Sequence, residues 1–146
     1  MVKQPRVVHR RASALPIALL RAREAVSAPL RDMLQDSGLS EQKWRVLRVL
    51  EDCGPMEQTA LARGAGLLLS SLTRILNALE HEGLVARESV PHDRRRTVAK
   101  LTDQGLETLA RHAARSAAIF SEIEARFGAE RIEELLDMLE ALAEPS

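Results

Sequence analysis

Apolar residues recur at intervals of three and four near the start of the chain, which is the spacing of an amphipathic helix. The stripe covers residues 14–36 and consists of Leu15, Leu19, Ala22, Val26, Leu30 and Met33. Pro16 fits the first turn of this helix, but Pro29 falls in its interior, where a proline lacks the amide hydrogen that the helix uses. We therefore expect a kink at Pro29 and the end of the helix at Gly38.

A second helix is predicted over residues 40–53. The hydroxyl of Ser40 can accept a hydrogen bond from a free amide of the first turn, so Ser40 serves as the N-cap. The run Cys53-Gly54-Pro55 ends the helix. Its inner face carries Trp44, Leu47 and Leu50.

Two short helices follow in a helix-turn-helix pattern. Residues 56–63 form the first, with a break at Gly64-Ala65-Gly66, and residues 69–81 form the second, with Gly83 as its stop. The second helix has an apolar stripe of Leu72, Ile75, Leu76 and Leu79. Two short helices joined by a turn that contains glycine also occur in many helical domains that bind no nucleic acid.

The next segment favours a more specific fold. Residues 84–90 and 97–101 contain β-branched positions and flank the polar loop 91–96, which indicates a hairpin. Three arginines lie at the tip of this hairpin: Arg94, Arg95 and Arg96. A helix-turn-helix followed by such a hairpin is the outline of a winged helix, so the predicted fold class is mainly α with a small β-hairpin wing.

Long helices occupy the rest of the chain. Thr102 can cap a helix that runs to Gly128, and a last helix continues to residue 144 with apolar residues on one side and acids on the other. The apolar stripes of the first and last helices are far from the centre of a chain of this size. The same faces of a second copy would cover them, which predicts a twofold dimer.

Composition supports a folded protein of one domain. The chain has 146 residues, of which 45% are hydrophobic and 29% charged, so wholesale disorder is excluded. A single cysteine cannot form an internal disulfide, and we expect a cytoplasmic location. The start loosely imitates a secretion signal, but charged residues follow its nine apolar positions at once. No stretch is long enough to span a membrane.

The net charge of zero hides an uneven distribution. Four basic residues and no acid lie within residues 1–12, whereas six acids and one arginine lie within residues 129–146. A local basic patch is what meets phosphates, so a neutral total does not exclude a nucleic-acid partner.

Motifs for catalysis and metal binding are missing from the sequence. No two of the four histidines are four residues apart, and no Ser-His-Asp set or glycine-rich phosphate loop is present. Cys53 is expected to be an inert thiol, because the sequence shows none of the surroundings that activate a cysteine. An enzyme is therefore the least expected class, and we expect no cofactor and no metal.

Three segments together resemble one known family. They are Ser70 to Arg87, Asp93-Arg94-Arg95, and Val98 to Gly105, the last with the helix start Leu101-Thr102-Asp103-Gln104-Gly105. These motifs and their spacing resemble the MarR (multiple antibiotic resistance regulator) family. Pro29-Leu30 and the run Gly38 to Arg48 are similar to the branch that controls the degradation of homoprotocatechuate and related aromatic acids.

The resemblance implies a dimeric winged-helix protein that binds double-stranded operator DNA. Such a protein is usually a repressor, released from DNA by a small phenolic or carboxylic ligand. It further implies that residues 1–146 form a single MarR-type domain, with residues 40–101 as the DNA-binding lobe and residues 14–36 and 103–144 as dimerisation helices.

Short polar side chains at the start of a recognition helix can approach phosphates and base edges. Here they are Ser70, Ser71, Thr73, Arg74 and Asn77. Arginines suit phosphates and the narrow minor groove, and by motif position Arg95 is the family's wing arginine, between Arg94 and Arg96. Asp93 corresponds to the wing aspartate, which can pair with Arg74 or cap the loop. The alternatives are a solvated helix face and a charged surface loop.

An aromatic acid needs an apolar slot and a cation for its carboxylate. The junction of the first two helices with the long fifth helix offers Leu19, Val26 and Trp44 as a slot, with Arg23, Arg45 or Arg115 as donors. Core packing of the tryptophan and surface salt bridges of the arginines are the competing interpretations.

Two functions from different classes therefore remain. The leading hypothesis is a ligand-responsive repressor of an aromatic-degradation operon. The alternative is a winged-helix module that docks a protein, with a solvated wing. The arginines of the wing and the basic residues at the start of the chain favour DNA.

Overall fold

The computed structural model describes residues 11–145, which form helices and one small sheet. The basic residues before Arg11 lie outside the described part. In chain order the elements are a 3₁₀ turn (Ala12–Ala14), α1 (Leu15–Leu34), α2 (Glu41–Cys53), β1 (Met56–Glu57), α3 (Gln58–Ala65), α4 (Leu69–His81), β2 (Val85–Val90), β3 (Asp93–Leu101), α5 (Asp103–Phe127) and α6 (Ala129–Ala143). The predicted class, mainly α with a small wing, is confirmed.

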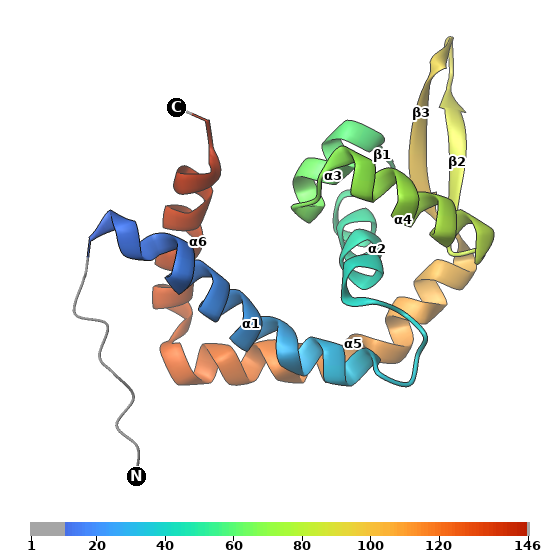
Figure 1. Cartoon of the computed structure of the whole chain (residues 1–146). Coiled ribbons are helices and arrows are strands. Elements are labelled where there is room, and N and C mark those ends of the chain that lie inside the picture. Colours follow the sequence, from blue (N-terminus) through green and yellow to red (C-terminus); the bar gives the residue numbers. More distant parts are fainter. Residues whose placement is uncertain (1–10, 146) are drawn as a thin grey trace.

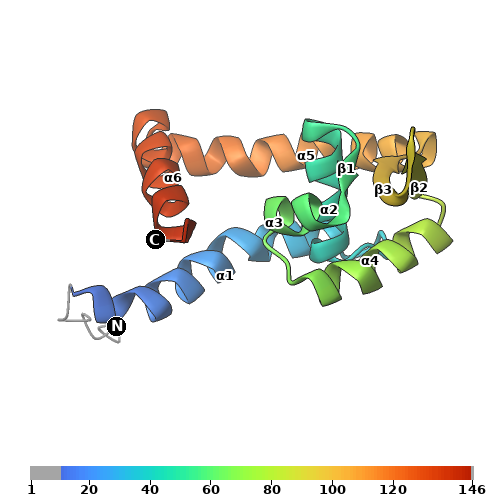
Figure 2. The same ribbon diagram turned by 90° about the horizontal axis from the view of Figure 1, so that it is seen from above.

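The elements are divided between a packed group and an extended base (Figure 1). Helices α2, α3 and α4 and the sheet lie together at one end, with the β2–β3 hairpin projecting from them. Helix α5 leads from the hairpin to the opposite end, where α6 turns away from it, and α1 packs along α5. The view from above in Figure 2 shows that α1 and α5 diverge toward the end where α6 lies.

The hydrophobic core lies inside the packed group. Leucines on the predicted inner faces of α2 and α4 are buried, and the end of α1 closes one side of this core. The largest fully buried side chains are Leu47, Leu61, Leu72, Leu76, Leu79, Val46 and Val85. By contrast, α6 buries no residue, and α1 buries none before Leu30. The apolar stripes predicted at the two ends of the chain are therefore uncovered.

Two helix starts are capped by the predicted side chains. Ser40 Oγ accepts a hydrogen bond from Lys43 N at 3.1 Å, and Thr102 Oγ1 accepts one from Gly105 N at the same distance. Thr102 also donates its hydroxyl hydrogen to the carbonyl of Gly83 at 2.6 Å. Thr102 thus joins the turn after α4 to the start of α5.

The first helix differs from its predicted end. It continues through Pro29 without interruption and ends at Leu34, with Gln35 as its C-cap. Gly38 does not close it, because this glycine lies in the following loop with φ +71°. Ser37 stabilises that loop, since its hydroxyl donates to the Leu34 carbonyl at 2.6 Å and accepts from Leu39 N at 3.1 Å.

The short helix predicted over residues 56–63 is wrong at its start. Met56 and Glu57 form β1, which pairs antiparallel with Ala99 and Val98 of β3 in a sheet of order β1-β3-β2. Pairing with a distant strand overrides the local pattern here. Helix α3 therefore begins two residues later and runs through Gly64.

The wing has a shorter turn than expected. Strands β2 and β3 pair antiparallel, and only Pro91 and His92, the latter with φ 73°, separate them. The arginines predicted in a loop belong to β3, because the short turn lets pairing resume at once. Between the pairs Ser89↔Thr97 and Val90↔Asp93 the register shifts, so three residues of β3 have no partner on β2. They are Arg94, Arg95 and Arg96, and such a bulge turns side chains away from the ladder.

Over residues 11–145, no helix combines the length and the apolarity that crossing a bilayer requires.

Candidate nucleic-acid interface

Helix α4 presents an exposed polar face beside the hairpin. Ser70, Arg74 and Asn77 are exposed, whereas Ser71 and Thr73 are partly buried. The opposite face of α4 enters the core through its four leucine and isoleucine positions. The geometry of α4 is therefore that of a helix anchored on one side and open to a large partner on the other.

Thr73 is engaged within the protein. Gln58 Nε2 donates to Thr73 Oγ1 at 2.6 Å, and this hydroxyl donates in turn to the Leu69 carbonyl at 2.9 Å. The contact ties the start of α3 to the first turns of α4. Thr73 thus positions the helix, and its partner Gln58 was missed because nothing in the local pattern marks it.

Asn77 is also held by a neighbour. Arg87 of β2 donates from Nη2 to Asn77 Oδ1 at 2.7 Å, and its Nε lies 3.7 Å from Glu80 Oε2. The amide hydrogens of Asn77 remain able to donate. Arg87 thus links β2 of the wing to α4, a contact that only the hairpin register reveals.

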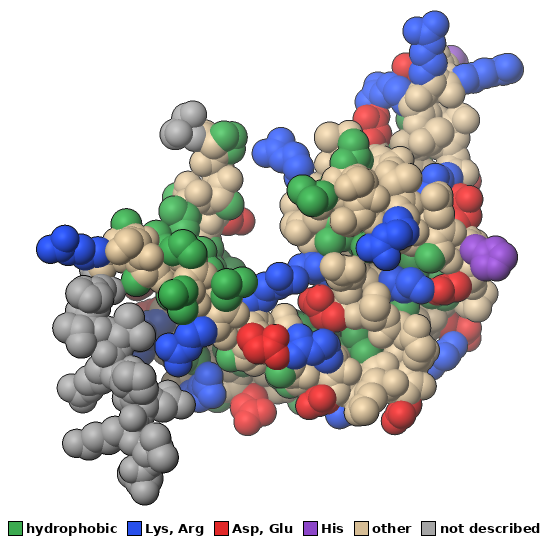
Figure 3. All heavy atoms as spheres, in the orientation of Figure 1, with side chains coloured by type: hydrophobic (Ala, Val, Ile, Leu, Met, Phe, Trp, Pro, Cys, Tyr) green, Lys and Arg blue, Asp and Glu red, His purple; other side chains and the backbone are tan. Residues whose placement is uncertain are grey.

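The wing arginines have different surroundings. Among residues 11–145, neither Arg94 nor Arg95 forms an ion pair, whereas Arg96 pairs with Glu57 and donates from Nε to its Oε1 at 2.6 Å. Asp93 Oδ1 accepts a hydrogen bond from Arg95 N at 3.1 Å, so it caps the turn. No contact between Asp93 and Arg74 is present in this part of the chain. Figure 3 shows basic side chains gathered at the tip of the hairpin.

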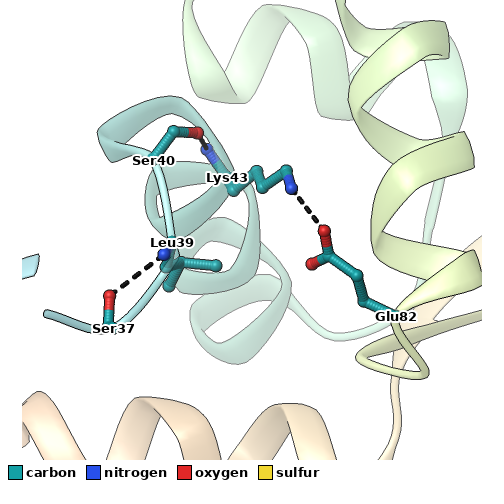
Figure 4. Close-up of polar contacts among 5 residues, drawn as sticks. All are labelled: Ser37, Leu39, Ser40, Lys43 and Glu82. Atoms are coloured by element: carbon teal, nitrogen blue, oxygen red, sulfur yellow. Dashed lines mark hydrogen bonds and ion pairs between the residues drawn. The ribbon is translucent and has the colours of Figure 1, made fainter.

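An ion pair links α2 to the end of α4. Lys43 Nζ donates to Glu82 Oε1 at 2.5 Å, one residue after the end of α4, as Figure 4 shows. The backbone amide of Lys43 is held by Ser40, so the lysine leaves a fixed helix start. A displacement of α2 would therefore be transmitted through this ion pair to the end of α4.

Trp44 and Arg45 lie together on α2. The indole of Trp44 is buried, with the Arg48 guanidinium 6.0 Å from its centroid. Nε and Nη2 of Arg45 are buried and have no hydrogen-bond partner among the described residues. The nearest carboxylate oxygen, Glu41 Oε2, is 3.8 Å from Nη2. The Arg45 side chain is 26% exposed and within residues 11–145 has only this long ion pair, so its two buried nitrogens lack a hydrogen bond, which is costly and which an anion would supply.

The other predicted ligand residues lie elsewhere. Leu19, Arg23 and Val26 line a groove of about 620 Å³ between α1, α5 and α6, and neither Trp44 nor Arg45 reaches it. Arg115 is exposed on α5 and is also outside this groove. A single chain therefore does not bring the six predicted residues together.

The uncovered apolar surface follows the terminal helices. It is formed by Leu15, Ile17, Leu19, Leu20, Val26, Leu106, Phe120, Phe127, Leu135, Leu136, Met138 and Leu142. On α1 the hydrogen bond from Arg31 to Glu24 raises the pKa of the arginine, which stays charged. An apolar surface of this extent marks an interface.

Comparisons with known proteins place this geometry among regulators. The MarR family profile matches residues 39–97. The homoprotocatechuate degradative operon repressor of Escherichia coli is 37% identical over 127 residues, which cover 87% of this chain and 86% of that repressor.

Two solved structures have the same fold. NadR in complex with 4-hydroxyphenylacetate superposes with a TM-score of 0.84 at 33% identity, with 100% of each chain covered. Sco3205, a MarR family transcriptional regulator from Streptomyces coelicolor in complex with DNA, has a TM-score of 0.79 at 26% identity, with 99% of this chain and 95% of that chain covered.

Proposed function

Because this chain belongs to the MarR family of transcriptional regulators, we propose that it represses an operon for the degradation of an aromatic compound. We further propose that a phenolic or aromatic carboxylic acid releases it from its operator. The observation that carries the DNA-binding role is the exposed polar face of α4 beside a hairpin with two unpaired arginines. The E. coli relative is named as a repressor of such an operon.

On this proposal α4 enters the major groove, and the wing reaches the adjacent backbone or minor groove. Ser70, Ser71 and Arg74 meet phosphates and base edges, and Asn77 offers its amide hydrogens. Residues 40–101 serve as the DNA-binding lobe. Chromosomal DNA as the partner places the protein in the cytoplasm.

The terminal helices, residues 14–36 and 103–144, are proposed to pair two copies. We expect a dimer at micromolar concentration, because twofold association covers the apolar surface of α1, α5 and α6. Analytical ultracentrifugation measures the mass directly. A species of 16.2 kDa alone at that concentration would contradict the proposal. As a dimer the protein should protect two half-sites centred about 10 bp apart.

Arg45 supports the effector part of the proposal. Its buried Nε and Nη2 have no hydrogen-bond partner within residues 11–145, where Glu41 Oε2 lies 3.8 Å from Nη2, and the buried Trp44 indole is its neighbour in the sequence. A carboxylate could accept from this guanidinium, while a ring packs against apolar side chains. NadR was solved in complex with 4-hydroxyphenylacetate, so a protein of this fold can bind such an acid.

The test of this function combines two signals in one titration. Trp44 is the only tryptophan and the chain has no tyrosine, so intrinsic fluorescence reports on this position. Addition of hydroxyphenylacetic acid, dihydroxyphenylacetic acid or a hydroxycinnamate should change the emission saturably. The same concentrations should release the protein from the intergenic DNA upstream of its own gene. Release by none of these acids would refute the aromatic effector.

Arg45→Gln is the matching variant. Losing one charge-assisted hydrogen bond corresponds to about 2 kcal/mol, so the acid should bind roughly 30-fold more weakly, while DNA binding without ligand is retained. Arg115→Gln is the comparison, because this arginine is exposed on α5. If Arg115→Gln showed this loss of affinity for the acid and Arg45→Gln showed none, the carboxylate site would lie on α5.

The protein-docking alternative makes a different prediction. A module that binds only protein would not shift random duplex DNA at any salt concentration, whereas a DNA-binding wing gives salt-dependent binding. No contact among residues 11–145 favours the alternative.

A further inference from the structure

Two leucines at the start of α4 are exposed and do not belong to the hydrophobic core. Leu68 is 75% exposed and Leu69 is 51% exposed. The apolar face that anchors α4 begins at Leu72, and Leu67 on the other side packs against the core. Neither exposed leucine belongs to α1, α5 or α6, where the uncovered apolar surface of the terminal helices lies.

Leu68 also breaks a local rule. It is the N-cap of α4, and no side chain caps the helix there. Ser, Thr, Asp or Asn at this position would accept a free amide and stabilise the helix, as Ser40 and Thr102 do at α2 and α5. A residue that weakens its own helix and stays exposed is best explained by a partner outside the chain.

The surroundings of the two leucines identify the partner. Ser70 follows them directly, and Arg63 at the end of α3 and Arg74 on α4 are both exposed. Figure 3 shows apolar side chains at the corner where α3 meets α4, beside basic ones. An apolar patch among cations fits a polyanion that carries apolar groups within reach. Duplex DNA does so, because each thymine presents a C5-methyl group in the major groove.

We propose that Leu68 and Leu69 read thymine in the operator by covering C5-methyl groups in the major groove. The proposal rests on the proposed DNA-binding function. The first residues of a recognition helix approach base edges, and these leucines occupy that end of α4. Their contribution matters because Thr73 and Asn77, two of the polar candidates, already hold contacts inside the protein.

The test replaces thymine with uracil, which removes only the methyl group. A duplex site is selected from a random-sequence library with the full-length protein, and it is then prepared with thymidine or with deoxyuridine. The wild-type protein should bind the thymine duplex about fourfold more tightly for each methyl that a leucine covers. For the variant with both Leu68→Ala and Leu69→Ala, the ratio of the two affinities should fall to about one.

Ser70→Ala is the matched control, because it changes the same end of α4 without removing apolar surface. This variant should lose affinity for both duplexes and keep the wild-type ratio. Thermal melting confirms folding, which these exposed positions should not disturb. Sedimentation of the double-leucine variant should show an unchanged dimer.

Three results would overturn the inference. An equal affinity of the wild type for both duplexes shows that no methyl is read, and an unchanged ratio in the double-leucine variant shows that other residues read it. A shift to monomer in that variant assigns the leucines to a contact between copies. If the library yields no duplex that the wild type binds, the DNA-binding function itself is refuted, and this outcome is distinct from the three above.

Discussion

Arg95→Ala is expected to weaken binding to all duplexes, operator and random alike. Its guanidinium forms no ion pair among the described residues, and it belongs to the bulge of β3 near the tip of the hairpin. Each phosphate contact contributes about 0.9 to the slope of log affinity against log salt, so one lost contact per subunit lowers the slope of a dimer by about two. At physiological salt this corresponds to a loss of about 30-fold in affinity. Fluorescence anisotropy at several salt concentrations measures both quantities.

Two other arginines provide the controls. Arg111→Ala, on the exposed surface of α5, should leave the slope unchanged. Arg96→Ala should change it less than Arg95→Ala, because Glu57 already neutralises Arg96 in the free protein. A slope in Arg95→Ala equal to that of the wild type would show that the wing does not contact phosphate.

Gly105→Ala is expected to destabilise the protein by about 3 kcal/mol. A Cβ at this position would overlap the backbone carbonyl oxygen of Leu84 and lie 3.2 Å from Leu101 Cδ2. The first turn of α5 therefore packs directly on the chain after α4. Because Thr102 caps α5 through Gly105 N, a shift at this glycine also strains the cap. Thermal unfolding should show a midpoint lowered by about 10 °C.

Gly64→Ala is the matched helical control. The added Cβ meets two side-chain methyl groups, Val49 Cγ1 at 3.1 Å and Met56 Cε at 3.8 Å, which can move. Alanine also favours the helix by about 1 kcal/mol over glycine, so the net change should be small. Equal destabilisation by the two variants would show that the close approach at Gly105 does not matter.

The helices could be predicted because their signals are local. Ser40 and Thr102 cap the turns that follow them, and the leucine spacing of α4 marks its buried side within one stretch of sequence. The strand at Met56 was missed because its partners, Ala99 and Val98, lie far along the chain. Two residues carry too little pattern to show which strand they join.

The candidate site shows the same division. The sequence identifies which side chains of α4 and the wing are polar, and most of them are exposed. It does not show which are already engaged, since Gln58 and Arg87 reach Thr73 and Asn77 only after the helices and the hairpin are packed. The six ligand residues were predicted from neighbouring helices, and a helix has several faces. Whether Leu19 and Trp44 serve one ligand stays a prediction.

Because Thr102 ties the turn after α4 to the start of α5, a tilt of α5 displaces its far end relative to α4. The 25 residues of α5 extend for about 37 Å, from the contact with the turn after α4 to the start of α6. A tilt of about 5° over that length displaces one end by roughly 3 Å relative to the other. Successive bases along a strand are about 3.4 Å apart, so this displacement approaches one step of the duplex. In the proposed dimer, a slight reorientation of the two copies where they meet would thus displace α4 of the second copy by about one base step from its half-site.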